Sequence, residues 1–509
     1  MSLLKSAATV SGLTLVSRVT GVIRDMLIAR YFGASSETDA FYVAFRLPNM
    51  LRRLFAEGAF QQAFVPMLAD VRESNPEGSE RFINHVFTVL ALAVFFASLL
   101  GVLAAPLLVW LIAGGLSDQS FDLATNLTRF MFPYIAFMSL VALAAAVLNT
   151  WKRFAIPAFT PVLLNLSFII FTVLLAPELE EPIWALAVAV IVGGVLQLGT
   201  QFAALRRLGI RVRPASVKES LGDSNVCRVM KLMVPALFGV GVAQLSILIN
   251  TNIASHLSSG AVTWLNFADR LMEFPTALLG VALGTVLLPG LSSAFAKGDY
   301  TRYNALLDRG LRLVFLVAVP ASVGLWLTSE ALVSFLFQGR NFTPADVQQT
   351  ATAVIGYSVG LIGLISLKIV APAFYARKDI RTPVKVAAWS LVIVQMVNLI
   401  SVPLFSHAGL ALSVGLGSVF NTSVLLLILR RRGIYTPLAG WGFAIVRVLV
   451  ASLLMGAALW YAQTFVSWTD MPWGLRAVGV LGMVSMAALL YFGVLMLFGW
   501  RPSELRRRS

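Results

Sequence analysis

The stretch LTLVSRVTGVIRDMLIARYF, residues 13–32, is long and apolar enough to cross a membrane, yet it carries Arg18, Arg24, Asp25 and Arg30. A spanning helix needs about 20 mostly apolar residues. A charge at the centre of such a helix costs roughly 2.5–3.5 kcal/mol on insertion scales. These side chains are therefore expected to face partners or water in a polar cavity. The arginines also interrupt the apolar run, so we do not expect a cleavable signal.

The composition indicates that lipid surrounds most of the chain. Of 509 residues, 58% are hydrophobic and 12% are charged, and the mean hydropathy is +0.83. An average soluble domain is about 25% charged. The net charge of +15 would suggest nucleic acid in a soluble protein, but the basic residues cluster in short loops, which indicates membrane orientation instead. With one cysteine, Cys227, and no CxxC motif, we expect neither a disulfide within the chain nor a metal site.

Hydropathy predicts an all-α polytopic membrane protein with fourteen spanning helices. The predicted spans lie near residues 7–33, 39–70, 84–112, 122–149, 156–176, 183–206, 228–256, 262–290, 305–328, 348–376, 383–405, 409–430, 440–465 and 475–499. We also expect a short interfacial helix at 330–338. No polar stretch is long enough to form a soluble domain.

The loops between these spans alternate in charge. One set is basic and contains Arg72, Arg81, Lys152, Arg153, Arg206, Arg207, Arg211, Arg213, Lys218, Lys297, Arg302, Arg377, Lys378, Arg381, Arg430, Arg431, Arg432, Arg506, Arg507 and Arg508. The other set is poor in Lys and Arg and includes GASSE (33–37), GGLSDQS (114–120) and PELEEP (177–182). Under the positive-inside rule both termini are cytoplasmic, which requires an even number of spans.

Two short matches suggest an internal repeat. The pair KR at 152–153 precedes Pro157, and the pair RK at 377–378 precedes Pro383. The interval of about 225 residues corresponds to six predicted spans. A six-plus-six repeat with two added spans fits this interval, and paired bundles around a central site are common in transporters.

Spacing places the charges of the second predicted span on one stripe. Asp39, Arg46 and Arg53 are seven residues apart and Glu57 follows four residues after Arg53, so all four share a helix face. Arg52 lies about 100° to the side of this stripe. In the eighth predicted span, Asp269 and Glu273 are separated by four residues and Arg270 and Glu273 by three.

Arginines outnumber acids in the first, second and eighth predicted spans. The arginines are Arg18, Arg24, Arg30, Arg46, Arg52, Arg53 and Arg270, and the acids are Asp25, Asp39, Glu57, Asp269 and Glu273. The surplus indicates an anionic ligand, and the planar guanidinium suits phosphate because it donates two parallel hydrogen bonds. We favour Arg18, Arg24, Arg52 and Arg270 as ligand-binding residues, whereas Arg30, Arg46 and Arg53 fit structural ion pairs equally well. Asp39 and Glu57 are interpreted as gating or packing partners.

Long blocks of the sequence resemble the MurJ/MviN lipid II flippases. They are GVIRD (21–25), TDAFYVAFRLPNMLRRLFAEGAFQQAFVP (38–66), NTWKRFAIPAFTPVLLN (149–165), FADRLMEFPTALLGVALGTVLLP (267–289) and KIVAPAFYARKDIRTPVK (368–385). The resemblance covers the whole chain. That family belongs to a superfamily that also holds multidrug exporters and polysaccharide-precursor flippases.

The resemblance implies a fold and a function. The fold would be an N-terminal lobe (1–225), a C-terminal lobe (226–433) and a C-terminal segment (434–509), whose two helices form a groove for a polyprenyl tail and precede a basic tail. The substrate would be lipid II, the undecaprenyl-diphosphate-linked peptidoglycan precursor, flipped from the cytoplasmic to the periplasmic leaflet of a bacterial inner membrane by alternating access. Arg18, Arg24, Arg52 and Arg270 would bind it, with Asp25, Asp39, Arg53, Glu57, Asp269 and Glu273 as charged partners or gating residues.

The energy source is expected to be the membrane potential. No P-loop occurs, so ATP is not expected to drive transport directly, and no cofactor is expected. The coupling ion stays open. The expected partners are lipid II, membrane lipids and the cell-wall synthesis machinery, without nucleic acid.

The alternatives are another transporter of the same superfamily, an enzyme and a structural scaffold. A flippase of another polyprenyl-linked polysaccharide precursor is the main alternative, whereas a cation exporter of the same superfamily would need surplus acid in its cavity. An intramembrane glycosyltransferase would need catalytic acids on an interfacial face and usually a metal motif, which the sequence lacks, so we expect no enzyme. A structural scaffold would not need charges inside its spans.

Overall fold

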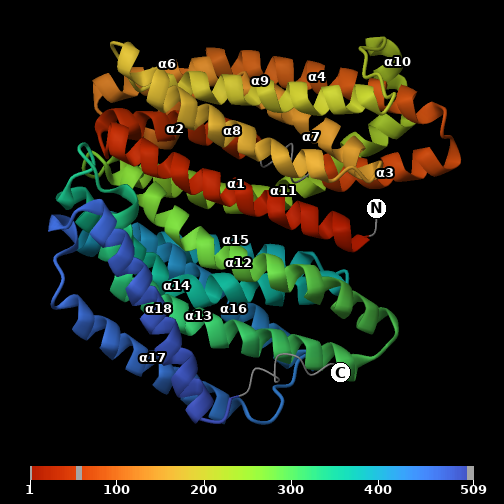
Figure 1. Ribbon diagram of the computed structural model, residues 1–509. Helices are drawn as coiled ribbons and strands as arrows, with labels where there is room; N and C mark the ends of the chain where they lie inside the picture. The colour runs from red at the N-terminus through yellow and green to blue at the C-terminus, as the bar shows by residue number, and fades with distance from the viewer. Residues whose placement is uncertain (1–2, 53–59, 501–509) are drawn as a thin grey trace. The chain divides into compact units, whose positions relative to one another are not determined.

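Every regular element that the computed structural model describes, within residues 3–52 and 60–500, is a helix (Figure 1). The chain divides into two compact units. The first comprises Met1–Thr263 with Gly339–Asn341, and the second comprises Trp264–Gln338 with Phe342–Ser509.

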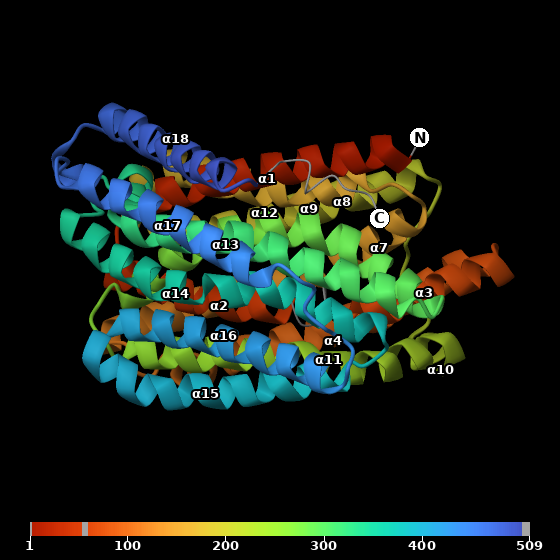
Figure 2. The ribbon, with the colours of Figure 1, turned by 90° about the horizontal axis from the view of Figure 1, so that it is seen from below.

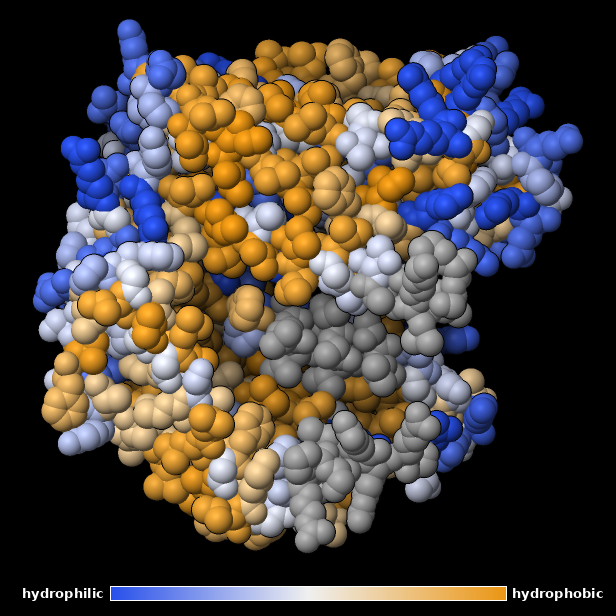
Figure 3. All heavy atoms as spheres, in the orientation of Figure 1, coloured by the Kyte–Doolittle hydropathy of each residue, from blue (hydrophilic) through white to orange (hydrophobic). Residues whose placement is uncertain are grey.

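The first unit is built around α8, which packs between α1 and α9, while α7 packs on α9 and α2 packs on α6. Its apolar surface over α8 and α9 lies between hydrophilic residues at the helix ends (Figure 3). The helices are α1 (Leu3–Phe32), α2 (Ser36–Leu51), α3 (Phe60–Ser74), α4 (Gly78–Leu103), α5 (Ala105–Ala113), α6 (Asp118–Met131), α7 (Tyr134–Thr150), α8 (Ala155–Leu174), η2 (Ala176–Glu178), α9 (Trp184–Arg207), α10 (Val217–Gly222) and α11 (Ser224–Ser255).

In the second unit α14 packs against α13 and α16, and α17 and α18 pack on α13 (Figure 2). Glycines allow the close approach of α14 and α16: a Cβ on Gly360 would lie 2.0 Å from the Cα of Gly415, as in small-residue interfaces of membrane helices. The helices are α12 (Ala261–Ala296, whose first three residues belong to the first unit), α13 (Tyr300–Phe337), α14 (Pro344–Ala376), α15 (Arg381–Phe405), α16 (His407–Arg431), α17 (Trp441–Gln463), η3 (Trp468–Asp470) and α18 (Trp473–Leu497).

Proline breaks two of the predicted spans. The span predicted at 84–112 consists of α4 and α5, and Pro106 occupies the first turn of α5, where its missing N–H has no consequence. The span predicted at 122–149 consists of α6 and α7, which are separated at Pro133. The span predicted at 39–70 corresponds to α2 and α3 in the described residues.

The prediction of a separate interfacial helix at 330–338 is wrong. Helix α13 continues without a break to Phe337. Polar residues near this point lie inside the helix: Thr328 is buried and its hydroxyl donates to the carbonyl of Gly324, 2.7 Å away. The helix thus satisfies its own polar side chains.

Ten helical stretches of the described residues are long and apolar enough to cross a membrane. Helices α1 and α2, which carry most of the arginines discussed above, are not among these ten. Most arginines of the predicted anion site therefore lie on helices that hydropathy alone does not identify as membrane spans.

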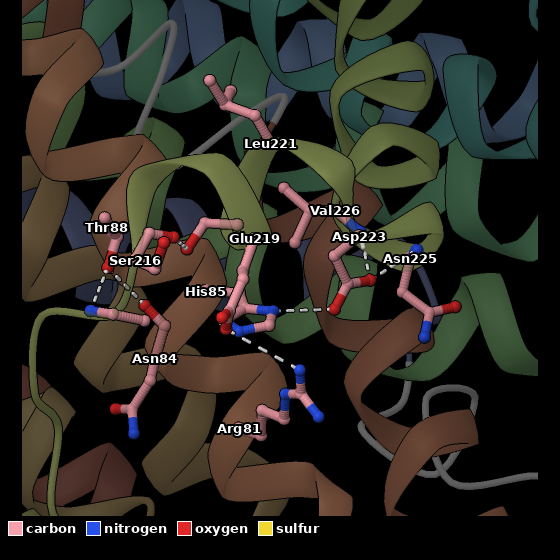
Figure 4. Close-up of polar contacts among 12 residues, drawn as sticks. Arg81, Asn84, His85, Thr88, Ser216, Glu219, Leu221, Asp223, Asn225 and Val226 are labelled. Atoms are coloured by element: carbon pink, nitrogen blue, oxygen red, sulfur yellow. Dashed lines mark hydrogen bonds and ion pairs between the residues drawn. The ribbon is translucent and has the colours of Figure 1, made fainter.

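A polar stripe on α4 holds the segment between α9 and α11 (Figure 4). Glu80, Asn84 and Thr88 lie at four-residue intervals and accept hydrogen bonds from the backbone N–H groups of Arg211, Arg213 and Ala215, at 3.3, 2.8 and 2.8 Å. Four helical residues rise about 6 Å and two extended residues span roughly 6.6 Å. The two spacings match, so alternate amides of the segment meet successive turns of α4.

Candidate functional site

Arg24 of α1 contacts three other side chains. Its side chain is 13% exposed and its Nη2 lies 2.7 Å from a carboxylate oxygen of Asp25. Its Nε also donates to Asp25 at 2.8 Å, and its Nη1 donates to Oδ1 of Asn165 at 3.0 Å. The guanidinium carbon lies 5.5 Å from the centre of the Phe168 ring, within the range of cation–π attraction.

Asn165 of α8 fixes the α1 backbone as well as the Arg24 side chain. Its Nδ2 donates to the carbonyl oxygen of Ser17 at 3.0 Å and to the hydroxyl of Thr20 at 3.1 Å. The sequence analysis did not single out Asn165 or Phe168. The one available signal was an amide within an otherwise apolar span, since such a group needs a partner in a helix bundle.

Asp39 and Arg46, the described members of the predicted stripe on α2, face the end of α11 and the start of α12. Asp39 is 3% exposed and accepts from the N–H of Gly260 at 2.7 Å and from the N–H and hydroxyl of Thr263 at 2.8 and 2.6 Å. Arg46 donates to the hydroxyl of Thr251. The Asp39 carboxylate therefore caps the first turn of α12, where a negative charge is favourable.

The other site residues on α1 and α2 have more open positions. Arg18 is exposed. Arg52 follows the last residue of α2 and donates from Nε and Nη2 to Oδ1 of Asn49, at 3.1 and 2.9 Å. Arg53 and Glu57 lie outside the described residues.

In the second unit, Arg270 and Glu273 of α12 form an ion pair. Nη1 of Arg270 lies 3.2 Å from Oε2 of Glu273, and the two side chains are 34% and 36% exposed. This is the pairing that their three-residue spacing predicts. Asp269 is exposed on the same helix.

The arrangement suits an anion better than a metal ion. In the described residues, no three His, Cys, Asp or Glu side chains lie close enough together to hold a metal. Of the five N–H donors of Arg24, the contacts with Asp25 and Asn165 use three. Two donors are left for a ligand, and the acid beside them keeps the cost of the partly buried charge low.

Solved structures of other proteins share this fold. A lipid II flippase MurJ in an inward closed conformation matches with a TM-score of 0.83, covering 98% of this chain and 99% of that chain at 24% sequence identity. An inward-facing multidrug resistance transporter of the MATE family, from the MOP superfamily, matches with a TM-score of 0.69 at 12% identity, covering 84% of this chain and 98% of that one. The fold is therefore that of multi-pass membrane transporters.

Sequence comparison then identifies the family. The family model described as lipid II flippase MurJ matches residues 28–476. The lipid II flippase MurJ of Burkholderia cenocepacia is 49% identical over 516 residues and is covered over 100% of both chains. The probable lipid II flippase MurJ of Vibrio cholerae is 37% identical and is covered over 99% of this chain and 98% of its own. The chain belongs to the lipid II flippase MurJ family, which confirms the resemblance noted in the sequence.

The family is one of transporters, so the prediction that the chain is not an enzyme is confirmed. The chain is a multi-pass membrane protein, as its apolar helices and its relatives both indicate.

Proposed function

We propose that the protein flips lipid II from the cytoplasmic to the periplasmic leaflet by alternating access. The observation that carries this proposal is the 49% identity to a lipid II flippase MurJ over the full length of both chains. Lipid II consists of an undecaprenyl-diphosphate and a disaccharide-pentapeptide, so its transport supplies precursor for peptidoglycan synthesis outside the membrane. The machinery that consumes the precursor is the expected protein partner.

The diphosphate of lipid II would bind in a cationic central cavity to Arg18, Arg24, Arg52 and Arg270. The donors left on the partly buried Arg24 support this assignment. Asp25, Asp39, Asp269 and Glu273 would act as charged partners or gating residues, and Arg53 and Glu57, outside the described residues, keep the same proposed roles. The carboxylates of Asp25 and Glu273 lie beside Arg24 and Arg270 and would hold these two charges in place while the cavity is empty.

The proposed architecture has fourteen spans: an N-terminal lobe (1–225), a C-terminal lobe (226–433) and a C-terminal pair (434–509) that carries the polyprenyl tail. Matching helix ends in the two lobes support it. Gly209 after α9 and Gly433 after α16 both have a left-handed φ, of +81° and +65°. Lys152 after α7 and Lys378 after α14 form a second matching pair, with φ of +58° and +60°. Helix α11 packs with the first compact unit, although its residues from 226 onward fall in the second proposed lobe.

The proposed location is the bacterial inner membrane with both termini in the cytoplasm, supported by the alternation of basic and non-basic loops. The membrane potential would drive the loaded step without a cofactor. When a diphosphate moves outward across an inside-negative membrane, its free energy falls by roughly 2.3 kcal/mol per charge for each 100 mV.

Depletion of the protein tests the proposed function. Cells in which its expression is switched off should accumulate lipid II that reagents added outside cannot reach, and re-expression should restore access. Synthesis of lipid II in the inner leaflet should continue during the block. If the precursor stays accessible from outside after depletion, the proposal is wrong; if another polyprenyl-linked glycan is trapped instead, the substrate is that glycan.

A further inference from the structure

The loop between α16 and α17 is fixed to α13 by the carboxylate of Asp308. Asp308 is 1% exposed, and its Oδ1 accepts three hydrogen bonds from the loop and from the start of α17. The donors are the hydroxyl of Tyr435 at 2.8 Å, the N–H of Leu438 at 3.2 Å and the indole N–H of Trp441 at 2.6 Å. A buried carboxylate needs such donors, because leaving its charge unsolvated would be costly.

Arg312, one turn further along α13, completes the contact. Its Nε donates to Oδ2 of Asp308 at 2.7 Å, and its Nη2 donates to the carbonyl oxygens of Leu438 and Ala439 at 3.0 and 2.7 Å. Its guanidinium carbon lies 5.4 Å from the centre of the Trp441 ring. Both oxygens of Asp308 are thereby satisfied, and one arginine joins α13 to the loop and to α17.

The contact extends one turn towards the start of α13. Asn304 donates to the carbonyl oxygen of Thr436 and accepts from its N–H, both at 2.9 Å. Asn304, Asp308 and Arg312 are spaced by four residues and so lie on one stripe of α13. Together they hold the loop from Thr436 to Ala439.

Helix α4 also holds a connecting segment through polar side chains spaced by four residues. The two stripes can therefore be compared residue by residue. On α4, Glu80, Asn84 and Thr88 hold the segment from Arg211 to Ala215. The contacts of Glu80 and Asn84 have counterparts about 225 residues later, in which Asn304 accepts from the N–H of Thr436 and Asp308 from that of Leu438. The position of Asn84 is taken by Asp308. At this position the first contact uses a neutral amide that accepts one N–H, whereas the second uses a buried carboxylate with an arginine and two aromatic donors.

The far end of the C-terminal pair is also joined to α13. The hydroxyl of Ser334 donates to the carbonyl oxygen of Trp468 at 3.1 Å, and Nε2 of Gln338 donates to that of Thr469 at 2.9 Å. Arg476 of α18 donates to the carbonyl oxygens of Ser334 and Thr469 at 3.3 and 2.9 Å. The loop before α17 and the connection between α17 and α18 are therefore both held on α13 by polar contacts.

We propose that Asp308 is a positioning residue for lipid transport: through Arg312, Tyr435 and Trp441 it sets the place of α17 and α18, and hence of the surface that receives the polyprenyl tail. The inference rests on the proposed function, in which this pair carries the tail. Both helices present large exposed apolar side chains, including Phe443, Leu453, Leu481 and Leu489. A long flexible chain binds well only to a surface already in place, since ordering that surface on binding would cost affinity.

The substitution Asp308→Asn tests the inference with a change in only one group. An amide has one accepting oxygen, so its NH2 must face either Arg312 or the three donors at Oδ1. We expect the purified variant to bind undecaprenyl lipid II about tenfold more weakly than the wild type in native mass spectrometry, and a farnesyl analogue with the same headgroup within about twofold of the wild type. A loss of overall folding would instead weaken the binding of both.

The matched control is Asp299→Asn, at the exposed start of the same helix, where Asp299 accepts from the N–H of Arg302 and asparagine is an equally good cap. It should bind both lipids as the wild type does. If Asp308→Asn does not accumulate, the double variant Tyr435→Phe/Trp441→Phe, which keeps the Asp308–Arg312 pair, replaces it, and the same selective loss is expected.

Two results would overturn the inference, and they are distinguishable. If the wild type prefers the undecaprenyl chain but the variant retains that full preference, Asp308 does not position the tail surface. If the wild type itself shows no chain-length preference, the proposed role of α17 and α18 in carrying the tail fails, and the inference fails with it.

Discussion

At the scale of single residues, Arg24 combines a fixed position with open donors. Asp25 and Asn165 hold three of its five N–H groups, and Phe168 lies against its face. Such a guanidinium loses little side-chain entropy when an anion binds, because most of its freedom is already gone. The anion would then meet a planar fork that matches two phosphate oxygens.

Substitution of Arg24 by alanine is expected to abolish flipping, and Arg24→Lys should reduce its rate about tenfold or more, because a point charge cannot replace the two-pronged contact. The measurement is the outer-leaflet exposure of lipid II, with the amount of protein in the membrane determined in parallel. The control is Arg228→Ala, which removes an exposed arginine of α11. Normal exposure of lipid II by the Arg24→Ala variant would contradict the anion site.

Asp39 allows a prediction about stability. In Asp39→Asn one oxygen is replaced by an NH2 group that faces the N–H of Gly260 or Thr263, leaving a buried donor unsatisfied. Such a loss costs about 1–3 kcal/mol, so the purified variant should unfold at a lower temperature than the wild type. Asp118→Asn, at an exposed position, should leave the unfolding temperature unchanged; an equal drop in both variants would show that the capping of α12 is not the cause.

These residues also show how far sequence reasoning reached. Charge within apolar spans was enough to single out Arg24 and Asp39, because such charges are costly and rare. The partners were not predictable in the same way. Asn165 carries no charge, and its contact with Arg24 joins two helices that are distant in sequence. Asp39 was predicted to share a helix face with Arg46 and Arg53, but its carboxylate caps the start of α12. Only the folded chain brings Asp39 to Gly260 and Thr263.

At the scale of elements, the segment between α9 and α11 is held by more than the α4 stripe. Asp223, just before α11, lies 2.8 Å from Nδ1 of His85 on α4 (Figure 4). Partial burial raises the pKa of the Asp223 carboxyl, but the hydrogen bond from His85 and those from the N–H groups of Asn225 and Val226 outweigh it. The pKa of Asp223 in the folded protein therefore lies below its ordinary value of 3.8.

The lowered pKa gives a prediction with a definite sign. The stability contributed by ionised Asp223 is fully present above the unfolded pKa of 3.8 and is lost as the pH falls through the folded pKa. Asp223→Asn should therefore unfold at a lower temperature than the wild type at pH 5, by an amount that begins to shrink below about pH 4. Glu219→Gln, which removes an exposed pairing with Arg81 at 3.8 Å, should have little effect at any pH. A gap between Asp223→Asn and the wild type that does not shrink at all between pH 5 and pH 3 would show that charge is not involved.

Hydropathy predicted the elements better than their ends. Every predicted span overlaps one or two helices of the described residues, because about 20 apolar residues in a row have few alternatives to a helix in lipid. The differences lie at helix breaks. The span predicted at 84–112 is divided just before Pro106, and the span predicted at 122–149 is one apolar stretch interrupted at Pro133. The helix expected at 330–338 is the end of α13.

At the scale of the whole molecule, the charge distribution decides how transport responds to voltage. If the arginines stay in place while the diphosphate moves, the substrate carries negative charge across the field. If the arginines move with it, the charges cancel and the voltage has no effect on the step. The free energy change of the loaded step differs between the two cases by roughly 2.3 kcal/mol per uncompensated charge per 100 mV.

We expect the first case, since Arg24 is held to Asn165 of the same compact unit and cannot leave it with the substrate. The test uses proteoliposomes with an imposed potassium diffusion potential. Flipping towards the positive side should accelerate several-fold per 100 mV even when only part of one charge crosses the field, because about 1.4 kcal/mol corresponds to a factor of ten in rate. Reversing the sign of the potential should slow flipping by a similar factor. Vesicles in which the potential is clamped at zero by valinomycin and equal potassium on both sides provide the reference. A rate independent of voltage would mean that positive charge of the protein crosses together with the diphosphate, and that the driving force lies in an ion gradient.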